Sequence, residues 1–315
     1  MKNFTSVHDV QDIGELLQLA RSCKLPDSNP DKPGSGKTLG LIFMNPSLRT
    51  RLSTQKAGIK LGMDVMVMNF SGEGWALETQ DGAIMDGTKA EHIKEAAAVI
   101  GEYCDIIGIR SFPGLQDREA DYSEEILNQL IKYAGVPVIS LESATRHPLQ
   151  SLADILTIEE FRKVRRPKVV MSWAPHPRAL PHSVPNSFVE WASRMDYELL
   201  VTHPEGYELS PSFMDNVNVE YDQKKALKDA DFVYVKNWSS FEPYGKVLNQ
   251  DREWMISEEK LQETNDARVM HCLPVRRNVV IADDVLDSER SIVIQEAANR
   301  VFAAQAVLRQ IVSSI

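Results

Sequence analysis

Residues 38–54 read TLGLIFMNPSLRTRLST, and this stretch decides the fold class. Its first six residues, 38–43, are apolar or β-branched, which is typical of a buried strand. Pro46 then interrupts the chain, and Ser47 stands where a helix N-cap would satisfy a free backbone N–H group. A strand that runs directly into a helix is the repeating unit of α/β proteins. We therefore predict an α/β fold with polar chemistry at this junction.

The same alternation recurs along the chain. Segments 91–103, 123–135 and 151–164 carry apolar residues at i, i+3, i+4 and i+7, which predicts amphipathic helices. Short apolar runs between helices predict parallel strands covered on both faces. The predicted strands are 38–43, 64–68, 105–110, 136–140, 168–173, 197–201, 231–235 and 268–271. Half of them precede residue 147, so we predict two doubly wound parallel-sheet domains, 1–146 and 147–315, with a last helix at about 293–312 that packs back on the first domain.

Composition narrows the classes of partner. The chain has 315 residues, of which 43% are hydrophobic and 25% charged, and this is ordinary globular composition. A net charge of -10 disfavours nucleic acid and anionic membranes as partners, although a local basic pocket could still hold a small anion. We expect neither a membrane span nor a signal peptide. Cys23, Cys104 and Cys272 are too scattered for a disulfide framework or a CxxC metal site, which favours a reducing cytoplasm.

Polar, charged or aromatic residues follow every predicted strand. Ligands of open α/β sheets bind beyond the carboxyl ends of the strands. The segments at these ends are MNPSLRTR, NFSGEGW, RSF, ESATRHPLQ, APHPR, THPEG, KNW and HCLPVRRN. No pair of cysteines, histidines or carboxylates has metal-ligand spacing, so we expect a binding site without a metal or cofactor.

The segment SLRTR at 47–51 has the chemistry of a phosphate site. A helix N-terminus offers free N–H groups and the positive end of the helix dipole, and here two guanidinium groups and hydroxyls join them. The alternative is a solvated basic helix start. Arg110 after the third strand, with His147 and Gln150 after the fourth, favours the phosphate site.

Three motifs in order, SLRTR, ATRHPLQ and HCLP, resemble those of the carbamoyltransferases over nearly the whole chain. HCLP is similar to the ornithine branch rather than the aspartate branch. The chain departs from ordinary ornithine carbamoyltransferases because Leu48 replaces a hydroxyl residue and DFVYVKNWSSF has no SMG segment. GWALE, MDGTKAEH, WAPHPR, VKNW and HCLPVRRN look instead like the N-acylornithine carbamoyltransferases of arginine synthesis.

The resemblance implies an active site in the cleft between two domains of a homotrimer. It assigns carbamoyl phosphate to Ser47, the Leu48 backbone, Arg49, Thr50, Arg110, His147, Gln150, the backbone carbonyls of Cys272 and Leu273, Arg300, and Trp75 of a neighbouring subunit. Within that set it assigns catalysis to Arg49, Thr50, Arg110, His147, Gln150 and Cys272. For the acylated amino acid it implies Glu142, His176, Lys236, Arg276 and Ala90.

The implied reaction is attack of an uncharged δ-amine on the carbamoyl carbon. Thr50, Arg110 and His147 would stabilise the oxyanion that forms before phosphate leaves. Neither a covalent intermediate nor a metal is required. The buried strand-end thiol of Cys272 is expected to be inert, with only its backbone acting.

Ala90 stands at the position that separates the two acyl specificities in the family. N-acetylornithine enzymes carry glutamate there and N-succinylornithine enzymes carry proline, and Val280 replaces an acetyl-type lysine. Both observations favour N-succinyl-L-ornithine as acceptor and N-succinyl-L-citrulline as product. The alternatives are an N-acetylornithine carbamoyltransferase, an ornithine carbamoyltransferase, and a non-catalytic α/β protein that binds a phosphorylated metabolite.

Overall fold

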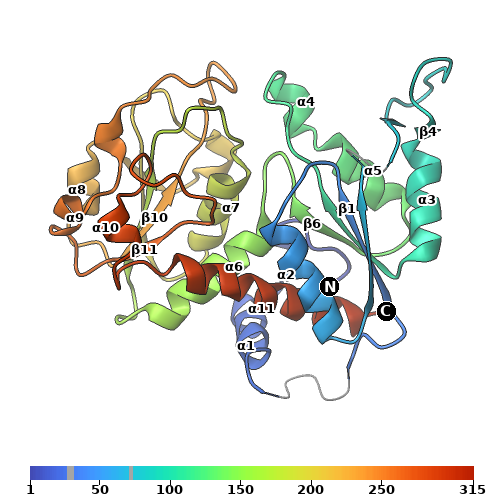
Figure 1. The fold of residues 1–315 in the computed structure, drawn as a ribbon, viewed down its shortest axis with the longest axis horizontal. Helices are drawn as coiled ribbons and strands as arrows, with labels where there is room; N and C mark the ends of the chain where they lie inside the picture. Colours follow the sequence, from blue (N-terminus) through green and yellow to red (C-terminus); the bar gives the residue numbers. More distant parts are fainter. Residues whose placement is uncertain (27–31, 71–73) are drawn as a thin grey trace. The chain divides into compact units, whose positions relative to one another are not determined.

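The computed structural model describes residues 1–26, 32–70 and 74–315 (Figure 1). The chain divides into two compact units. Unit 1 comprises Met1–Pro113, Glu119–Leu149 and Arg300–Ile315, and unit 2 comprises Gly114–Arg118 and Gln150–Asn299. The predicted limits of the two functional domains, 1–146 and 147–315, stay a prediction. Among the described residues, no helix is both long and apolar enough to cross a membrane.

Unit 1 is built on a parallel sheet with the strand order β2-β1-β5-β6. Its strands are β1 (Thr38–Phe43), β2 (Asp64–Asn69), β5 (Ile106–Arg110) and β6 (Val138–Glu142). These are the four strands predicted before residue 147, with ends that differ by two residues at most. Its helical segments are η1 (Val7–Asp9), α1 (Ile13–Ser22), α2 (Arg49–Lys60), α3 (Ile93–Tyr103), α4 (Arg118–Tyr122), α5 (Glu125–Tyr133) and the C-terminal part of α11 (Val293–Val312). The first residue of α4 is the last residue of a unit 2 segment.

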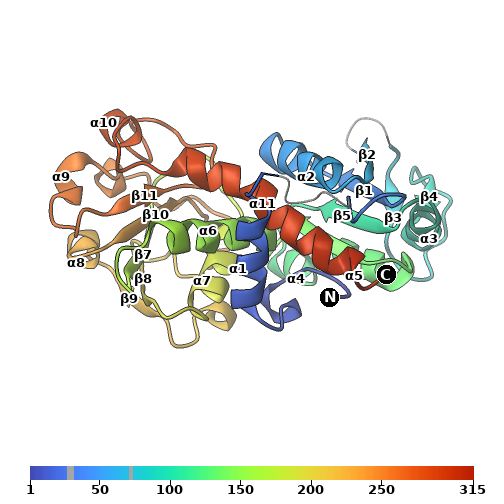
Figure 2. The same cartoon turned by 90° about the horizontal axis from the view of Figure 1, so that it is seen from below.

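The helices of unit 1 cover both faces of its sheet (Figure 2). Ile42, Ile107 and Ile109 point to one face, where they pack with residues of α3 and α5. On the other face α2 packs so closely that a Cβ at Gly58 would lie 3.0 Å from a methyl carbon of Leu39. The doubly wound arrangement predicted from the alternating pattern is therefore confirmed for this unit.

The start of α2 differs from the prediction. The helix begins at Arg49, and its N-cap is Leu48, whose backbone is already helical with φ -79° and ψ -60°. No side chain caps the helix, so the prediction of Ser47 as N-cap is wrong. Because the cap hydroxyl is absent, the first N–H groups of α2 have no side-chain acceptor at the N-cap and can serve a bound anion.

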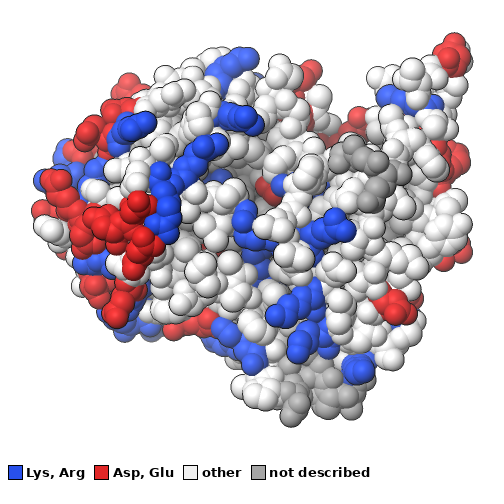
Figure 3. Space-filling model, viewed as in Figure 1, with Lys and Arg blue, Asp and Glu red and all other residues white. Residues whose placement is uncertain are grey.

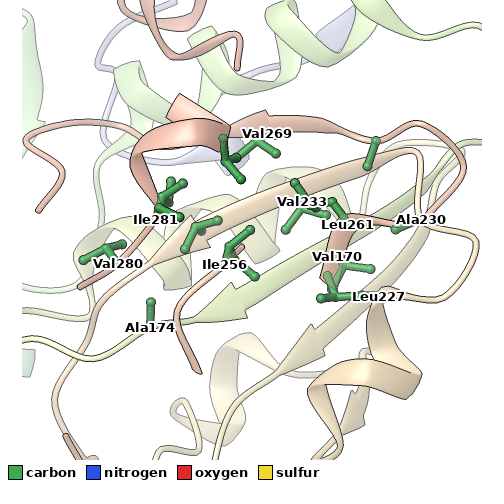
Figure 4. Close-up of a cluster of buried hydrophobic side chains, with 14 of the residues drawn as sticks. Val170, Ala174, Leu227, Ala230, Val233, Ile256, Leu261, Val269, Val280 and Ile281 are labelled. Atoms are coloured by element: carbon green, nitrogen blue, oxygen red, sulfur yellow. The ribbon is translucent and has the colours of Figure 1, made fainter. Parts of the chain in front are cut away.

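Unit 2 has a parallel sheet with the strand order β11-β10-β7-β8-β9. Its strands are β7 (Lys168–Trp173), β8 (Glu198–Thr202), β9 (Asn218–Glu220), β10 (Phe232–Lys236) and β11 (Arg268–Met270). Its helical segments are α6 (Pro148–Phe161), which begins on the last residues of unit 1, α7 (Ser183–Ala192), η2 (Pro211–Phe213), α8 (Gln223–Leu227), η3 (Arg252–Trp254), α9 (Glu258–Leu261), α10 (Asp283–Leu286) and the first part of α11. Figure 4 shows Val170, Val233 and Val269 of three neighbouring strands packed with Ile256 and Ile281.

Two features of unit 2 depart from the sequence predictions. Strand β9 was not predicted, because it is a three-residue edge strand without an apolar run. Helix α6 starts earlier than the predicted segment 151–164 and is buried on all sides as far as Ile158, so the amphipathic prediction is wrong there. Its polar residues Gln150 and Asp154 lie inside the protein, where they require hydrogen-bond partners.

A buried histidine in unit 2 predicts acid sensitivity. Burial lowers the pKa of His182 from 6.5 to about 4, although its Nε2 donates a hydrogen bond to the Ser239 carbonyl at 2.6 Å. The unfolded chain takes up this proton below about pH 6.5 and the folded chain does not. The associated stability is therefore complete above pH 6.5 and is lost as the pH falls toward 4.

We expect His182→Gln to remove about 3 kcal/mol of the decrease in the free energy of unfolding between pH 7 and pH 4. Urea denaturation of both proteins across this range measures the difference. Burial lowers the pKa of His203 as well, so only the comparison between wild type and variant isolates His182. Equal pH dependence in the two proteins would contradict the prediction.

Candidate active site

The loop after β1 brings predicted phosphate ligands together in unit 1. An Arg300 guanidinium nitrogen donates a hydrogen bond to Thr50 Oγ1 at 2.6 Å, and both residues are buried. Arg49 Nε is buried and has no hydrogen-bond partner among the described residues. Figure 3 shows Lys and Arg atoms gathered over α2, although the chain as a whole is acidic. A buried guanidinium nitrogen without a partner is suited to an anionic ligand.

Arg110 is fixed at the end of β5 by neighbours in unit 1. Its Nε donates to Glu142 Oε2 at 3.2 Å, and its Nη1 donates to the carbonyls of Asn45 at 3.0 Å and Pro46 at 2.6 Å. His147 Nε2 lies 3.6 Å from the same Glu142 oxygen. Glu142, Arg110 and His147 are all more than nine-tenths buried. Glu142, for which the resemblance implied contact with the amino acid, thus lies beside two predicted carbamoyl phosphate ligands and neutralises part of the Arg110 charge.

Gln150 and the HCLP turn lie together in unit 2. Gln150 Nε2 donates to Asp154 Oδ1 at 2.7 Å and contacts Glu296 Oε1 at 3.3 Å, whereas its Oε1 is buried without a hydrogen-bond partner. The backbone N–H of His271, immediately before Cys272, donates to Glu296 Oε2 at 2.8 Å. Leu273 has φ 56°, a costly conformation for a leucine that is characteristic of functional turns. The sequence predicted Gln150, Cys272 and Leu273 but missed Asp154 and Glu296.

A sequence signal for Asp154 does exist. It lies four residues after Gln150 on the same helix, inside the apolar run LADIL, where an acid has no solvated face available. Glu296 has no comparable local signal, because its partners Gln150 and His271 are distant in sequence.

Four basic side chains gather at the strand ends of unit 2. Arg276 Nε donates to His176 Nε2 at 3.0 Å. On the other side of the ring, His176 Nδ1 lies 2.9 Å from the Arg178 carbonyl oxygen and 3.1 Å from the Arg178 backbone nitrogen. Burial, together with the charges of Arg276, Lys236 and Arg178, lowers the pKa of His176. None of these three cations has a carboxylate partner among the described residues. Such a cluster is suited to a ligand with carboxylate groups.

The structure also joins Trp75 and Ala90, which are distant in the sequence. The short parallel strands β3 (Leu77–Glu78) and β4 (Glu91–His92) pair in unit 1, and the Ala90 N–H donates to the Ala76 carbonyl at 3.2 Å. Trp75 Nε1 donates to Glu91 Oε2 at 2.9 Å, yet its side chain is 58% exposed. Both predicted residues thus belong to one exposed substructure, which short-range periodicity did not predict.

Family models match both parts of the chain. The aspartate/ornithine carbamoyltransferase carbamoyl-P binding domain matches residues 2–160, and the Asp/Orn binding domain matches residues 181–311. The chain belongs to the aspartate/ornithine carbamoyltransferase family. The carbamoyltransferase fold predicted from the motifs is thereby confirmed. As a separate observation, the described residues contain no cluster of three or more potential metal ligands.

Individual carbamoyltransferases refine this assignment. The chain is 55% identical over 317 residues to N-succinylornithine carbamoyltransferase of Bacteroides thetaiotaomicron, with 100% of both chains covered. It is 36% identical to N-acetylornithine carbamoyltransferase of Xanthomonas axonopodis pv. citri, over 88% of this chain and 87% of the relative. A solved N-acetyl-L-ornithine transcarbamylase with a glutamate-to-alanine substitution, complexed with carbamyl phosphate and N-succinyl-L-norvaline, has a TM-score of 0.92 and 34% identity, with 99% of this chain and 100% of that chain covered.

Proposed function

We propose that this carbamoyltransferase transfers the carbamoyl group of carbamoyl phosphate to the δ-amine of N-succinyl-L-ornithine, as a step of arginine biosynthesis. The products are N-succinyl-L-citrulline and phosphate. The observation that carries the proposal is the full-length 55% identity to an N-succinylornithine carbamoyltransferase. The charges and contacts of each unit support it.

Unit 1 supplies groups suited to the phosphate of carbamoyl phosphate. We assign the phosphate to the N-terminus of α2, with Ser47, Arg49 and the Thr50–Arg300 pair around it. Arg110 and His147 are assigned to the carbonyl oxygen, where negative charge develops during attack. The amine lone pair forms the new C–N bond, the C–O bond to phosphate breaks with its electron pair on phosphate, and the amine loses its proton to that phosphate. The arginines stabilise the leaving group throughout.

Unit 2 supplies charge suited to a dicarboxylate acceptor. N-succinyl-L-ornithine carries two carboxylates, whereas N-acetyl-L-ornithine carries one. Burying a carboxylate without a cation costs several kcal/mol. Arg178, Lys236 and Arg276 have no carboxylate partners among the described residues of unit 2, so they can neutralise both groups. A neutral His176 holds Arg276 in place without adding charge.

Ala90 supports the succinyl assignment independently. A glutamate-to-alanine variant of an N-acetyl-L-ornithine transcarbamylase was crystallised with N-succinyl-L-norvaline. The present chain carries alanine naturally at the position where the resemblance places glutamate in acetyl enzymes. Alanine adds no negative charge next to a second carboxylate and leaves room for it.

Product formation from three acceptors tests the proposal. Carbamoyl phosphate is supplied with ornithine, N-acetyl-L-ornithine or N-succinyl-L-ornithine, and the citrulline-type product is quantified. We expect the highest kcat/KM with the succinyl compound. A preference for N-acetyl-L-ornithine or ornithine would replace the acceptor assignment, and no product from any of the three would favour the non-catalytic binding protein.

We also propose that the enzyme is a homotrimer whose subunits share each active site. Unit 1 exposes apolar side chains that a monomer would leave in water: Leu48, Leu52 and Ile59 of the α2 region, Met66 and Met68 of edge strand β2, and Trp75. A cyclic assembly would cover this surface and place Trp75 at a neighbouring site.

Mixed subunits test the shared site. Trp75→Ala and Arg49→Ala proteins, each inactive alone, are unfolded, mixed in equal amounts and refolded together. Because each intact site then takes Arg49 from one subunit and Trp75 from the next, we expect activity at about a quarter of the sites. Mixing without unfolding is the control. A refolded mixture as inactive as its components would contradict the shared site.

A further inference from the structure

Two buried carboxyl groups lie behind Gln150 in unit 2, and the reaction as described does not use them. Asp154 of α6 and Glu296 of α11 are both 0% exposed. Gln150 Nε2 contacts both, at 2.7 Å to Asp154 Oδ1 and 3.3 Å to Glu296 Oε1. Since both contacts use the amide nitrogen, they determine which end of the Gln150 amide remains for a ligand. That end is Oε1, a buried acceptor without a hydrogen-bond partner.

Glu296 also holds the turn that follows β11. Its Oε2 accepts the backbone N–H of His271 at 2.8 Å, and His271 Nδ1 accepts the N–H of Leu273 at 2.8 Å. This chain of contacts passes through the residues whose carbonyls are assigned to the carbamoyl NH2, Cys272 and Leu273. One pair of acids therefore contacts both elements that present oxygen acceptors in unit 2.

The surroundings disfavour two negative charges in this pair. The titratable groups that face Glu296 are Asp154 from α6, Tyr234 from β10 and Cys272 from the turn. Burial and the Asp154 charge raise the pKa of Glu296 well above its usual range, and burial likewise raises that of Tyr234. Two adjacent carboxyl groups in such surroundings share one proton rather than ionise together.

We propose that Asp154 and a protonated Glu296 are a pair of positioning residues that orient the carbamoyl-binding acceptors, Gln150 Oε1 and the carbonyls of Cys272 and Leu273. Asp154, as the carboxylate, accepts from Gln150 and turns the amide so that Oε1 faces the ligand. Glu296, as the neutral acid, donates its proton to Asp154 and accepts from the His271 backbone. The inference rests on the proposed carbamoyl transfer and adds to it the source of selectivity for the NH2 end of the substrate.

Three variants in the full-length enzyme separate this role from simple packing. Glu296→Gln keeps one donor and one acceptor, as a neutral acid does, so we expect kcat/KM for carbamoyl phosphate within about threefold of wild type. Glu296→Ala removes both groups. Asp154→Asn replaces one carboxylate oxygen with an NH2 group, so that a donor faces either the Gln150 amide N–H or the Glu296 proton instead of an acceptor. For both we expect kcat/KM to fall about 10- to 100-fold. Inhibition by inorganic phosphate should remain unchanged, because the proposed phosphate ligands lie in unit 1.

Glu160→Gln is the matched control. Glu160 accepts from Asn299 at 2.9 Å, and so also links α6 to α11, but it does not contact Gln150 or the turn. We expect wild-type kinetics from this variant. Infrared difference spectra add a direct readout: the carbonyl band of a buried protonated carboxyl group should be present in wild type and absent in Glu296→Gln.

Several results would overturn the inference. The first two are a Glu296→Gln enzyme that is as impaired as Glu296→Ala, and an Asp154→Asn enzyme with wild-type kinetics. The third is inhibition by inorganic phosphate that weakens in the variants in proportion to their loss of kcat/KM. The fourth is a wild-type infrared spectrum without the band of a protonated carboxyl group. If Asp154→Asn does not fold, the comparison of Glu296→Gln with Glu296→Ala still decides. A wild-type protein inactive with all three acceptors would overturn the proposed function together with this inference, whereas an active wild type with any of the results above overturns the inference alone.

Discussion

Replacing Arg49 with alanine is expected to lower kcat/KM by about 10³-fold without changing the stability of the protein. The Arg49 guanidinium has no hydrogen bond or ion pair to the described residues, and its buried Nε is without a partner. Its removal therefore breaks no hydrogen bond or ion pair to the described residues, whereas it removes charge-assisted bonds to the leaving phosphate. Steady-state kinetics with both substrates and a thermal melt measure the two quantities.

Arg51→Ala is the control for the Arg49 variant. Arg51 lies on the same helix, carries the same charge and also has no partner among the described residues. Both arginines belong to the basic SLRTR segment, but the family resemblance assigns carbamoyl phosphate to Arg49 and not to Arg51. We expect it to retain near wild-type activity. Equal losses in the two variants would indicate a general electrostatic effect of α2 rather than a phosphate ligand at Arg49.

The second large effect is expected at Ala90. Ala90→Glu should lower the ratio of succinyl to acetyl kcat/KM by about 100-fold, because a glutamate would repel the second carboxylate and fill its space. Ala90 is exposed and donates only a backbone hydrogen bond, to the Ala76 carbonyl, which any L-residue other than proline can retain. The variant should therefore fold normally. The ratio is measured with both acceptors at saturating carbamoyl phosphate.

Ala90→Gln separates charge from size. Glutamine has nearly the shape of glutamate but no charge, so it should reproduce only the steric part of the change. If the ratio stays at its wild-type value in Ala90→Glu, this position does not contact the acyl group and the succinyl assignment loses its support from Ala90.

Much of the architecture could be predicted because local patterns carry it. The apolar run TLGLIF becomes β1 with the predicted ends, and KVVMSW becomes β7 with the predicted ends. Strands buried on both faces need continuous apolar residues, and this requirement is visible in the sequence. Edge strand β9 and the short pair β3–β4 escaped prediction because none of these strands has a buried apolar run.

The sequence by itself determined the strand–helix order, the basic loop after β1 and the motifs that place the chain among the carbamoyltransferases, since all of these are encoded over short stretches. Only the tertiary structure decided which distant groups meet: Thr50 with Arg300, Glu142 with Arg110, and Gln150 with Glu296. In the first and third of these pairs, more than a hundred residues of chain separate the two partners. Such contacts depend on how distant strands and helices pack, and no local periodicity in the sequence predicts that packing. The same packing buries polar side chains of α6 that a surface helix would expose to water, and Gln150 therefore donates its hydrogen bonds to Asp154 and Glu296 inside the protein.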